Sequence, residues 1–205
     1  MITRRELLGG TALATAGLLA GFRFQDAPRG TGGLIPASPL HHPLSQDKKL
    51  VPTESNIEGP YYRKDAPFRS KLATGLKGEA LKISGKVLSP DGTPLREALV
   101  DVWQADKEGA YDQTSDAFVL RGRIKTDKDG LYVYETIMPG QYDLGEAKRP
   151  AHIHYKVSAA GHALLTTQLY FKGDPWISKD PFVRKSLIIE VADKAGTFDI
   201  VLAKA

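Results

Sequence analysis

Two histidines one residue apart, His152 and His154, have the type and spacing that metal chemistry requires. On a β-strand, residues two apart point to the same face, so both imidazoles can reach one metal ion while Ile153 turns away. The sequence alone marks no third ligand. A site with two histidines and one carboxylate would need an acidic residue such as Asp101 or Asp143, and spacing singles out neither.

The composition excludes several other chemistries. The chain has no cysteine, which excludes a disulfide scaffold, a thiolate zinc site, an iron–sulfur cluster and a cysteine nucleophile. Its 205 residues suit one domain with a full core, and 20 glycines with 13 prolines favour a turn-rich, all-β architecture. The net charge of +4 falls to +2 beyond residue 25, with no basic run among aromatic residues, so nucleic acid is not an expected partner.

The amino terminus has the pattern of a bacterial export signal. A twin arginine, Arg4-Arg5, precedes a weakly hydrophobic run that ends near Ala20, before Arg23. This run is shorter than the roughly 20 apolar residues that span a bilayer, so we interpret residues 1–25 as a twin-arginine signal for periplasmic or extracellular export. No clear cleavage site follows. An uncleaved anchor is the alternative, and without it we expect no membrane partner.

Residues 26–52 are rich in proline and glycine, which is typical of an extended linker or a surface arm. His41 and His42 lie in this segment, and the sequence assigns them no metal role. We therefore divide the chain into the signal at 1–25, the linker at 26–52 and one domain at 53–205.

From residue 80 onward the hydrophobic pattern has a period of two, interrupted by turn residues at Ser89–Pro94 and Asp127–Gly130. We read both turns as β-hairpins. The pattern predicts an antiparallel β-sandwich of about eight short strands and no long helix. The expected strands are 81–88, 97–104, 121–126, 131–137, 151–158, 163–171, 186–192 and 197–202.

Several motifs within residues 54–180 occur together in one order. They are Gly59-Pro60-Tyr61-Tyr62, Ile83-x-Gly85-x-Val87, Val100-Asp101-Val102-Trp103-Gln104-Ala105-Asp106, Gly109-x-Tyr111, Thr136-Ile137-x-Pro139-Gly140-x-Tyr142, Arg149-Pro150-Ala151-His152-Ile153-His154 and Gln168-Leu169-Tyr170-Phe171-x-Gly173-Asp174. Taken together, they resemble the signature of the intradiol ring-cleavage dioxygenases, which include catechol 1,2-dioxygenases and protocatechuate 3,4-dioxygenases.

The resemblance implies that Tyr111, Tyr142, His152 and His154 bind one non-haem ferric ion per chain. Fe(III) is a hard cation that suits phenolate oxygen. A free tyrosine has a pKa of about 10, but bonding to a highly charged ion favours its deprotonated form. The implied reaction is cleavage of a catechol-type phenol with O₂, both oxygen atoms entering a cis,cis-muconate-type diacid. Tyr142 is then the ligand that the substrate displaces.

Five further residues receive roles from the resemblance. Arg149 and Gln168 match positions that stabilise charge on the activated ring, and Arg149 also faces the substrate. Pro60, Tyr61 and Trp103 are weaker candidates for the substrate pocket. Trp103 shares a strand face with Leu99, so a place in the core is its main alternative.

Two other functions account for part of the pattern. A non-catalytic, transthyretin-like binding module explains the strands and turns of residues 81–142, but not the joint presence of two tyrosines and two histidines. An iron protein without ring cleavage is the second alternative. The stretch 143–148 is short, so we expect an open pocket. The sequence does not decide whether the substrate is a catechol, a hydroxyquinol or a larger phenol. It also does not decide whether the chain forms a homo-oligomer.

Overall fold

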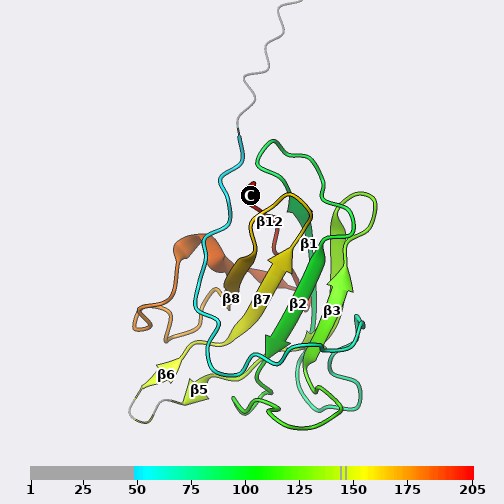
Figure 1. The fold of residues 1–205 in the computed structure, drawn as a ribbon. Helices are drawn as coiled ribbons and strands as arrows, with labels where there is room; N and C mark the ends of the chain where they lie inside the picture. The colour runs from blue at the N-terminus through cyan, green and yellow to red at the C-terminus, as the bar shows by residue number, and fades with distance from the viewer. Residues whose placement is uncertain (1–48, 144, 146) are drawn as a thin grey trace, which may run out of the picture. The chain divides into compact units, whose positions relative to one another are not determined.

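The computed structural model describes residues 49–143, 145 and 147–205 (Figure 1). The predicted signal at 1–25, positions 26–48 of the predicted linker, and His41 with His42 lie outside the described residues. The end of the predicted linker is described. There the backbone N–H of Leu50 donates to the Pro90 carbonyl at 2.7 Å, so these residues contact the first predicted turn.

One sheet has five strands in the order β3, β2, β7, β8 and β9. Their pairing is antiparallel except between β8 and β9, which are parallel. Figure 1 shows β3, β2, β7 and β8 side by side, with β2 and β7 in the middle. The bounds are β2 Leu99–Gln104, β3 Arg121–Lys125, β7 His152–Ser158, β8 Leu165–Phe171 and β9 Ile188–Ile189.

The other five-stranded sheet is built around β1, which pairs antiparallel with β4 and parallel with β11 and β12. β10 extends this sheet beyond β11, and β5 with β6 forms a separate two-stranded ladder. In the part of the chain that the structure describes, the one helical element is the 3₁₀ turn η1, Lys185–Leu187. The bounds are β1 Ala80–Leu88, β4 Leu131–Ile137, β5 Tyr142–Asp143, β6 Lys148–Arg149, β10 Val191–Ala192, β11 Ala195–Thr197 and β12 Ile200–Val201.

The two large sheets share one hydrophobic core. Alternate residues of their strands point into it, among them Ile83 from β1, Val102 from β2 and Val157 from β7. Tyr134 of β4 and Tyr155 of β7 meet across the core, where their hydroxyl oxygens share a hydrogen bond of 2.5 Å. This bond gives two fully buried hydroxyls a partner, as burial requires.

The opposite face of β2 and β7 is also covered. Tyr62, from the segment before β1, packs on Trp103 with ring centroids 4.8 Å apart, and the Arg69 N–H donates to the Arg123 carbonyl at 3.2 Å. Polar residues on this face, including His152 and His154, are therefore buried, at 3% and 2% exposure. The candidate site lies in this covered layer.

The structure confirms the all-β prediction and corrects its details. Both predicted turns form, but neither makes the hairpin that we expected, because β1 and β2 belong to different sheets, and so do β3 and β4. A turn motif reverses the chain without deciding which sheet the next strand joins. The sheets are mixed rather than antiparallel, because the chain after β8 crosses over before it pairs again. The predicted strands at 186–192 and 197–202 are four shorter ones.

No helix among the described residues is both long enough and apolar enough to cross a membrane.

Candidate metal centre

A cavity of about 230 Å³ lies against the outer face of the first sheet, beside the start of β7. Its walls come from segments that are far apart in the sequence: the stretch 57–61, the turn after β2, β5, β6, β7 and the loop between β8 and η1. The lining residues are Ile57, Gly59, Pro60, Tyr61, Tyr111, Tyr142, Arg149, His152, His154 and Phe182.

Both histidines of β7 point into this cavity. Their Nε2 atoms lie 3.1 Å apart, and each lies 3.2 Å from the hydroxyl oxygen of Tyr111. His152 Nδ1 donates to the Pro150 carbonyl at 2.7 Å, which leaves the lone pair on its Nε2. The Trp103 ring stacks on His154 with centroids 4.8 Å apart and fixes its plane. Three donor atoms therefore converge on one point.

A tight turn after β2 carries Tyr111 to the cavity. The Asp106 carboxylate accepts two backbone N–H groups of this turn, at 3.0 and 2.9 Å, as Asp does in turns of this kind. The Asp106 carbonyl also accepts the N–H of Gly140 at 2.7 Å. The turn is thereby tied to the segment that leads to Tyr142.

Two glycines allow these backbones to approach. A Cβ at Gly109, where φ is +89°, would lie 2.2 Å from the Gln141 carbonyl oxygen. A Cβ at Gly140 would lie 2.4 Å from the Lys107 carbonyl oxygen. Only glycine tolerates these contacts, and the contacts are the reason that Tyr111 and Tyr142 line the same cavity.

Tyr142 does not join the cluster of three donors directly. Its hydroxyl oxygen lies 2.5 Å from that of Tyr61, and the Tyr61 ring stacks on Tyr111 with centroids 4.4 Å apart. The Tyr111 and Tyr142 rings meet edge to face at 6.1 Å. Tyr61 thus connects the two tyrosines that the resemblance assigns to the metal.

Burial sets the charge of these side chains. It lowers the pKa of His152 to about 4 and that of His154 well below its usual value, so both imidazoles are neutral near pH 7. Burial also raises the pKa of Tyr111, which keeps the phenol protonated in the protein alone. Neutral imidazoles offer lone pairs to a cation, and a highly charged cation favours the phenolate.

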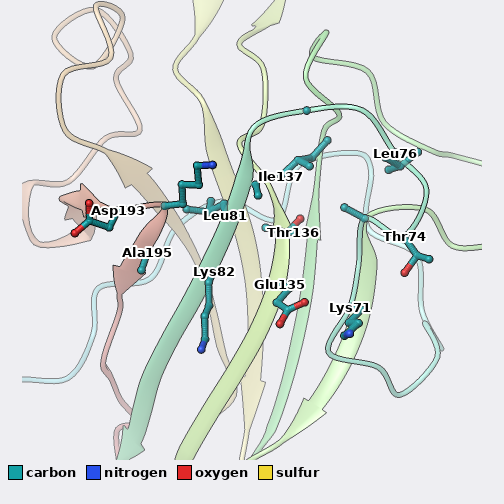
Figure 2. A pocket seen from close by; sticks show the side chains of 14 residues that line it. Lys71, Thr74, Leu76, Leu81, Lys82, Glu135, Thr136, Ile137, Asp193 and Ala195 are labelled. Carbon is teal, nitrogen blue, oxygen red and sulfur yellow. The ribbon is translucent and has the colours of Figure 1, made fainter.

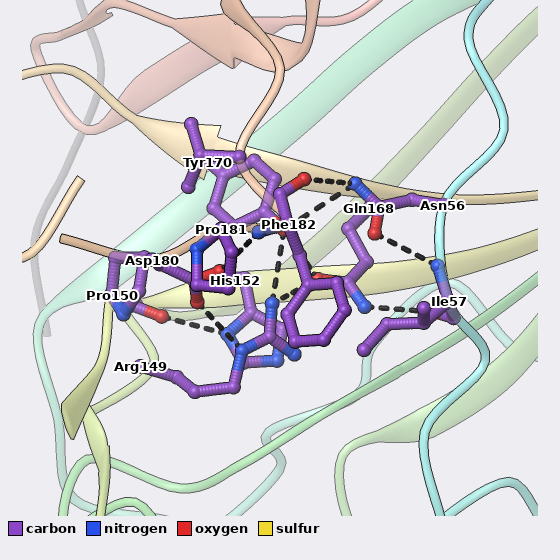
Figure 3. Close-up of polar contacts among 12 residues, drawn as sticks. Asn56, Ile57, Arg149, Pro150, His152, Gln168, Tyr170, Asp180, Pro181 and Phe182 are labelled. Carbon is purple, nitrogen blue, oxygen red and sulfur yellow. Dashed lines mark hydrogen bonds and ion pairs between the residues drawn. The ribbon is translucent and has the colours of Figure 1, made fainter. Parts of the chain in front are cut away.

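Arg149 is fixed at the cavity wall by a buried polar network (Figure 3). Its Nε donates to Asp180 Oδ2 at 2.7 Å, and its Nη2 donates to Gln168 Oε1 at 2.9 Å and to the Tyr170 hydroxyl at 3.0 Å. Gln168 in turn donates from Nε2 to the Ile57 carbonyl at 2.7 Å. Both charges of the ion pair are almost fully buried, so neither side chain can turn toward solvent.

The donor set fits a hard, highly charged metal ion. Two ligands bound to one ion at about 2.1 Å stand about 3 Å apart, close to the separations observed among these three atoms. The described ranges hold no group of three or more histidine or acidic side chains placed for a metal. Asp101 accepts a hydrogen bond from the Tyr62 hydroxyl at 3.1 Å and does not line the cavity. The tyrosines are therefore the available anionic ligands.

The structure brings together most of the predicted site residues. Tyr111, Tyr142, His152, His154, Arg149, Pro60 and Tyr61 all line the cavity, and their binding roles stay predictions. Two predicted residues lie behind the wall instead. The Trp103 ring stacks on the His154 ring, and Gln168 is fully buried and bonded to Arg149.

Sequence reasoning missed Ile57 and Phe182 at the cavity and Asp180 behind Arg149. Ile57 adjoins the Gly-Pro-Tyr-Tyr motif, which was the only local signal for it. Asp180 and Phe182 lie in the loop after β8, where no spacing or pattern marks them.

A second cavity, of about 480 Å³, lies between the loop before β1 and the outer edge of the other sheet (Figure 2). Lysines and acids such as Lys71, Lys82, Glu135 and Asp193 surround an apolar base of Leu81 and Ile137. It is larger but holds no histidine or tyrosine, so the smaller cavity is the candidate metal centre.

Comparisons with known proteins identify the family of the chain. A protein-family profile described as "Dioxygenase" matches residues 57–202. A chlorocatechol 1,2-dioxygenase of Rhodococcus opacus is 32% identical over 166 residues, which are 68% of this chain and 65% of that protein. A hydroxyquinol 1,2-dioxygenase of Rhizobium is 32% identical over 180 residues, which are 77% of this chain and 61% of that protein. The chain thus spans less than two thirds of these relatives.

A solved structure matches over its whole length. The dioxygenase domain of a dioxygenase carbohydrate-binding protein fusion from the cellulolytic bacterium Streptomyces sp. SirexAA-E is 41% identical, with a TM-score of 0.69. The match covers 76% of this chain and 100% of that one.

Proposed function

The chain belongs to the intradiol ring-cleavage dioxygenase family, and on that premise we propose that it cleaves a catechol-type ring with O₂. The bond broken lies between the two hydroxyl-bearing carbons, and both oxygen atoms enter a cis,cis-muconate-type diacid. The observation that carries this proposal is the convergence of the Tyr111 oxygen with the two histidine Nε2 atoms, in a cavity that Tyr142 also lines. The relatives named above are 1,2-dioxygenases of chlorocatechol and hydroxyquinol, which supports the reaction class.

We propose Tyr111, Tyr142, His152 and His154 as the ligands of one ferric ion per chain. When bound, Fe(III) supplies a Lewis acid that favours the deprotonated catechol and withdraws electron density from its ring. The neutral imidazoles and the tyrosine oxygens form a donor set that is suited to the ferric state.

Side chains of the protein handle the protons that the substrate loses. With the metal bound, Tyr142 would be held as a phenolate, and its Oη, which shares a 2.5 Å hydrogen bond with Tyr61, would then accept one catechol proton as the substrate enters. Tyr61 would keep the protonated Tyr142 in place by the same hydrogen bond. The second proton leaves with solvent, since Ile57 and Phe182 at the cavity are each more than one third exposed.

Arg149 stabilises negative charge that develops on the ring during oxygen attack. Its guanidinium is prepositioned by Asp180, Gln168 and Tyr170, so no reorganisation is needed when the charge forms. In this scheme Gln168 acts through Arg149, because its own side chain does not line the cavity.

We also carry forward three predictions about the whole chain. The arrangement of two sheets around one core is a β-sandwich. The twin-arginine segment directs export to the periplasm or beyond, tested by fractionating cells that express an Arg4→Lys, Arg5→Lys variant. Homo-oligomerisation stays open, and analytical ultracentrifugation decides it.

The test of the proposed function begins with the protein as purified. We expect about one iron per chain, a red-brown colour from phenolate-to-Fe(III) charge transfer, and a shift in that absorption when catechol is added without oxygen. With oxygen present, we expect uptake of one O₂ per catechol and a diacid product by mass spectrometry.

The two alternatives give different results. A protein that stays colourless after reconstitution with ferric ion has no such centre, which favours the binding module. A coloured protein that binds catechols but consumes no O₂ with any of them supports an iron protein without ring cleavage.

A further inference from the structure

The cavity contains one side chain with a permanent charge, Arg149. None of the other nine lining residues is a lysine, an arginine, an aspartate or a glutamate. A bound metal adds charge, but it acts on the two ring hydroxyls that every catechol shares. Among the lining residues, an anionic ring substituent would therefore depend on Arg149 for a counterion.

Arg149 is not free, because Asp180 neutralises it. The two side chains are 8% and 3% exposed, and Nε lies 2.7 Å from Oδ2. Asp180 is itself fixed, because its Oδ1 accepts the backbone N–H of Phe182 at 2.7 Å. Arg149 Nη2 is already bonded to Gln168 and Tyr170 (Figure 3). Arg149 lines the cavity and Asp180 does not, so the neutral pair turns the positive end of a dipole toward the ring but offers no net charge to hold a substituent anion.

Two cations in neighbouring segments are also engaged. Lys148 lies 3.6 Å from Asp143 Oδ1, and Arg184 Nη1 donates to the Pro181 and Val183 carbonyls. Neither cation lines the cavity. A carboxylate on the substrate ring would lose its hydration without gaining an uncompensated cation among the lining residues. This loss is costly beside a wall made of Ile57, Phe182 and aromatic rings.

We propose that Asp180 is a specificity-determining residue that restricts the site to catechols without a ring carboxylate. It acts through Arg149, whose charge it cancels, rather than by touching the substrate. This inference rests on the proposed function. It states that the site prefers neutral catechols to dihydroxybenzoates, a preference that membership of the family does not decide.

The first test uses the unaltered protein with catechol, 4-methylcatechol and 3,4-dihydroxybenzoate. Anaerobic calorimetry gives the Kd of each, and O₂ uptake gives kcat/KM. We expect both neutral catechols to exceed the carboxylated one at least about tenfold in each quantity, a difference of about 1.4 kcal/mol. Equal or better values for 3,4-dihydroxybenzoate overturn the inference. If the neutral catechols bind preferentially but none is consumed, the inference stands and the proposed activity fails.

The second test is Asp180→Asn, which keeps the size of the side chain and leaves the charge of Arg149 uncompensated. We expect the preference for catechol over 3,4-dihydroxybenzoate to fall at least about tenfold, mainly through tighter binding of the carboxylate. Asp180→Glu keeps the charge and should retain the preference. Asp129→Asn, an exposed carboxylate in the turn before β4, is the matched control and should leave it unchanged.

A merely structural role for Asp180 would lower activity toward both substrates alike. An unchanged preference in folded Asp180→Asn therefore contradicts the proposal. If Asp180→Asn does not fold, the proposal is tested by the preference of the unaltered protein for catechol over 3,4-dihydroxybenzoate and by whether Asp180→Glu retains it.

Discussion

Replacing Gly109 by alanine tests whether the close backbone approach between the turn after β2 and residues 139–142 builds the site. The new Cβ would lie 2.2 Å from the Gln141 carbonyl oxygen, about 1 Å inside normal contact, so one backbone must move. Gln141 precedes Tyr142, and the movement therefore carries that tyrosine away from Tyr61 and the cavity.

The expected cost has two parts. Alanine in the left-handed region, where Gly109 has a φ of +89°, costs about 1–2 kcal/mol. Relieving the contact costs a further 1–3 kcal/mol or so, as overpacking usually does. Gly92→Ala is the matched control, because its φ of +84° is similar and its Cβ meets nothing within 4 Å.

The assay compares the free energy of unfolding and the rate of catechol cleavage in the two variants. Gly92→Ala should lose about 1–2 kcal/mol and keep its rate. Gly109→Ala should lose about 1–3 kcal/mol more, and its rate should fall up to about 100-fold, the effect of a 1 Å misplacement. If the two variants have the same stability and the same rate, the close approach does not position Tyr142 and the reasoning is refuted.

Three more predictions follow from the structure. Tyr111→Phe should lose most of the iron by elemental analysis, together with most of the visible band, and full retention of both would rule out this ligand. Tyr155→Phe removes the core hydroxyl bond to Tyr134 and should cost about 1–2 kcal/mol in urea unfolding while the iron stays, so loss of iron there would point to a general structural effect. Burial raises the pKa of Asp101 from 3.8 to about 6, so the folded state holds that proton more tightly, and stability falls as the pH rises through this window. The Tm of Asp101→Asn relative to the unaltered chain should therefore increase between pH 4 and pH 7, and a constant difference would contradict this.

Local patterns predicted the strands well where the chain alternates strictly. The expected strand at 131–137 matches β4 residue for residue, and the expected strand at 121–126 ends one residue beyond β3. Period-two alternation is a local property, and so is the turn chemistry of Asp127–Gly130. Sheet membership is not local. The same turn could have paired β3 with β4, yet the two strands belong to different sheets, where β3 pairs with β2 and β4 pairs with β1.

The residues of the candidate site also fall into those that local spacing predicts and those that only tertiary contacts bring in. His152 and His154 share a strand face because of their spacing alone, so the sequence predicted that they point together. Tyr111 reaches them only because Gly109 and Gly140 let two distant backbones meet, and the pattern assigned Tyr111 to the site through a resemblance, not through its spacing.

By itself, then, the sequence determined the all-β class, the paired histidines and the family. Only the tertiary structure decided that Asp180 neutralises Arg149, that Gln168 lies behind the cavity wall and that Tyr142 is bonded to Tyr61. The reason is physical. Strand periodicity and turn chemistry act between neighbours in the chain, whereas a buried charge finds its counterion across 31 residues through the packing of the loop after β8.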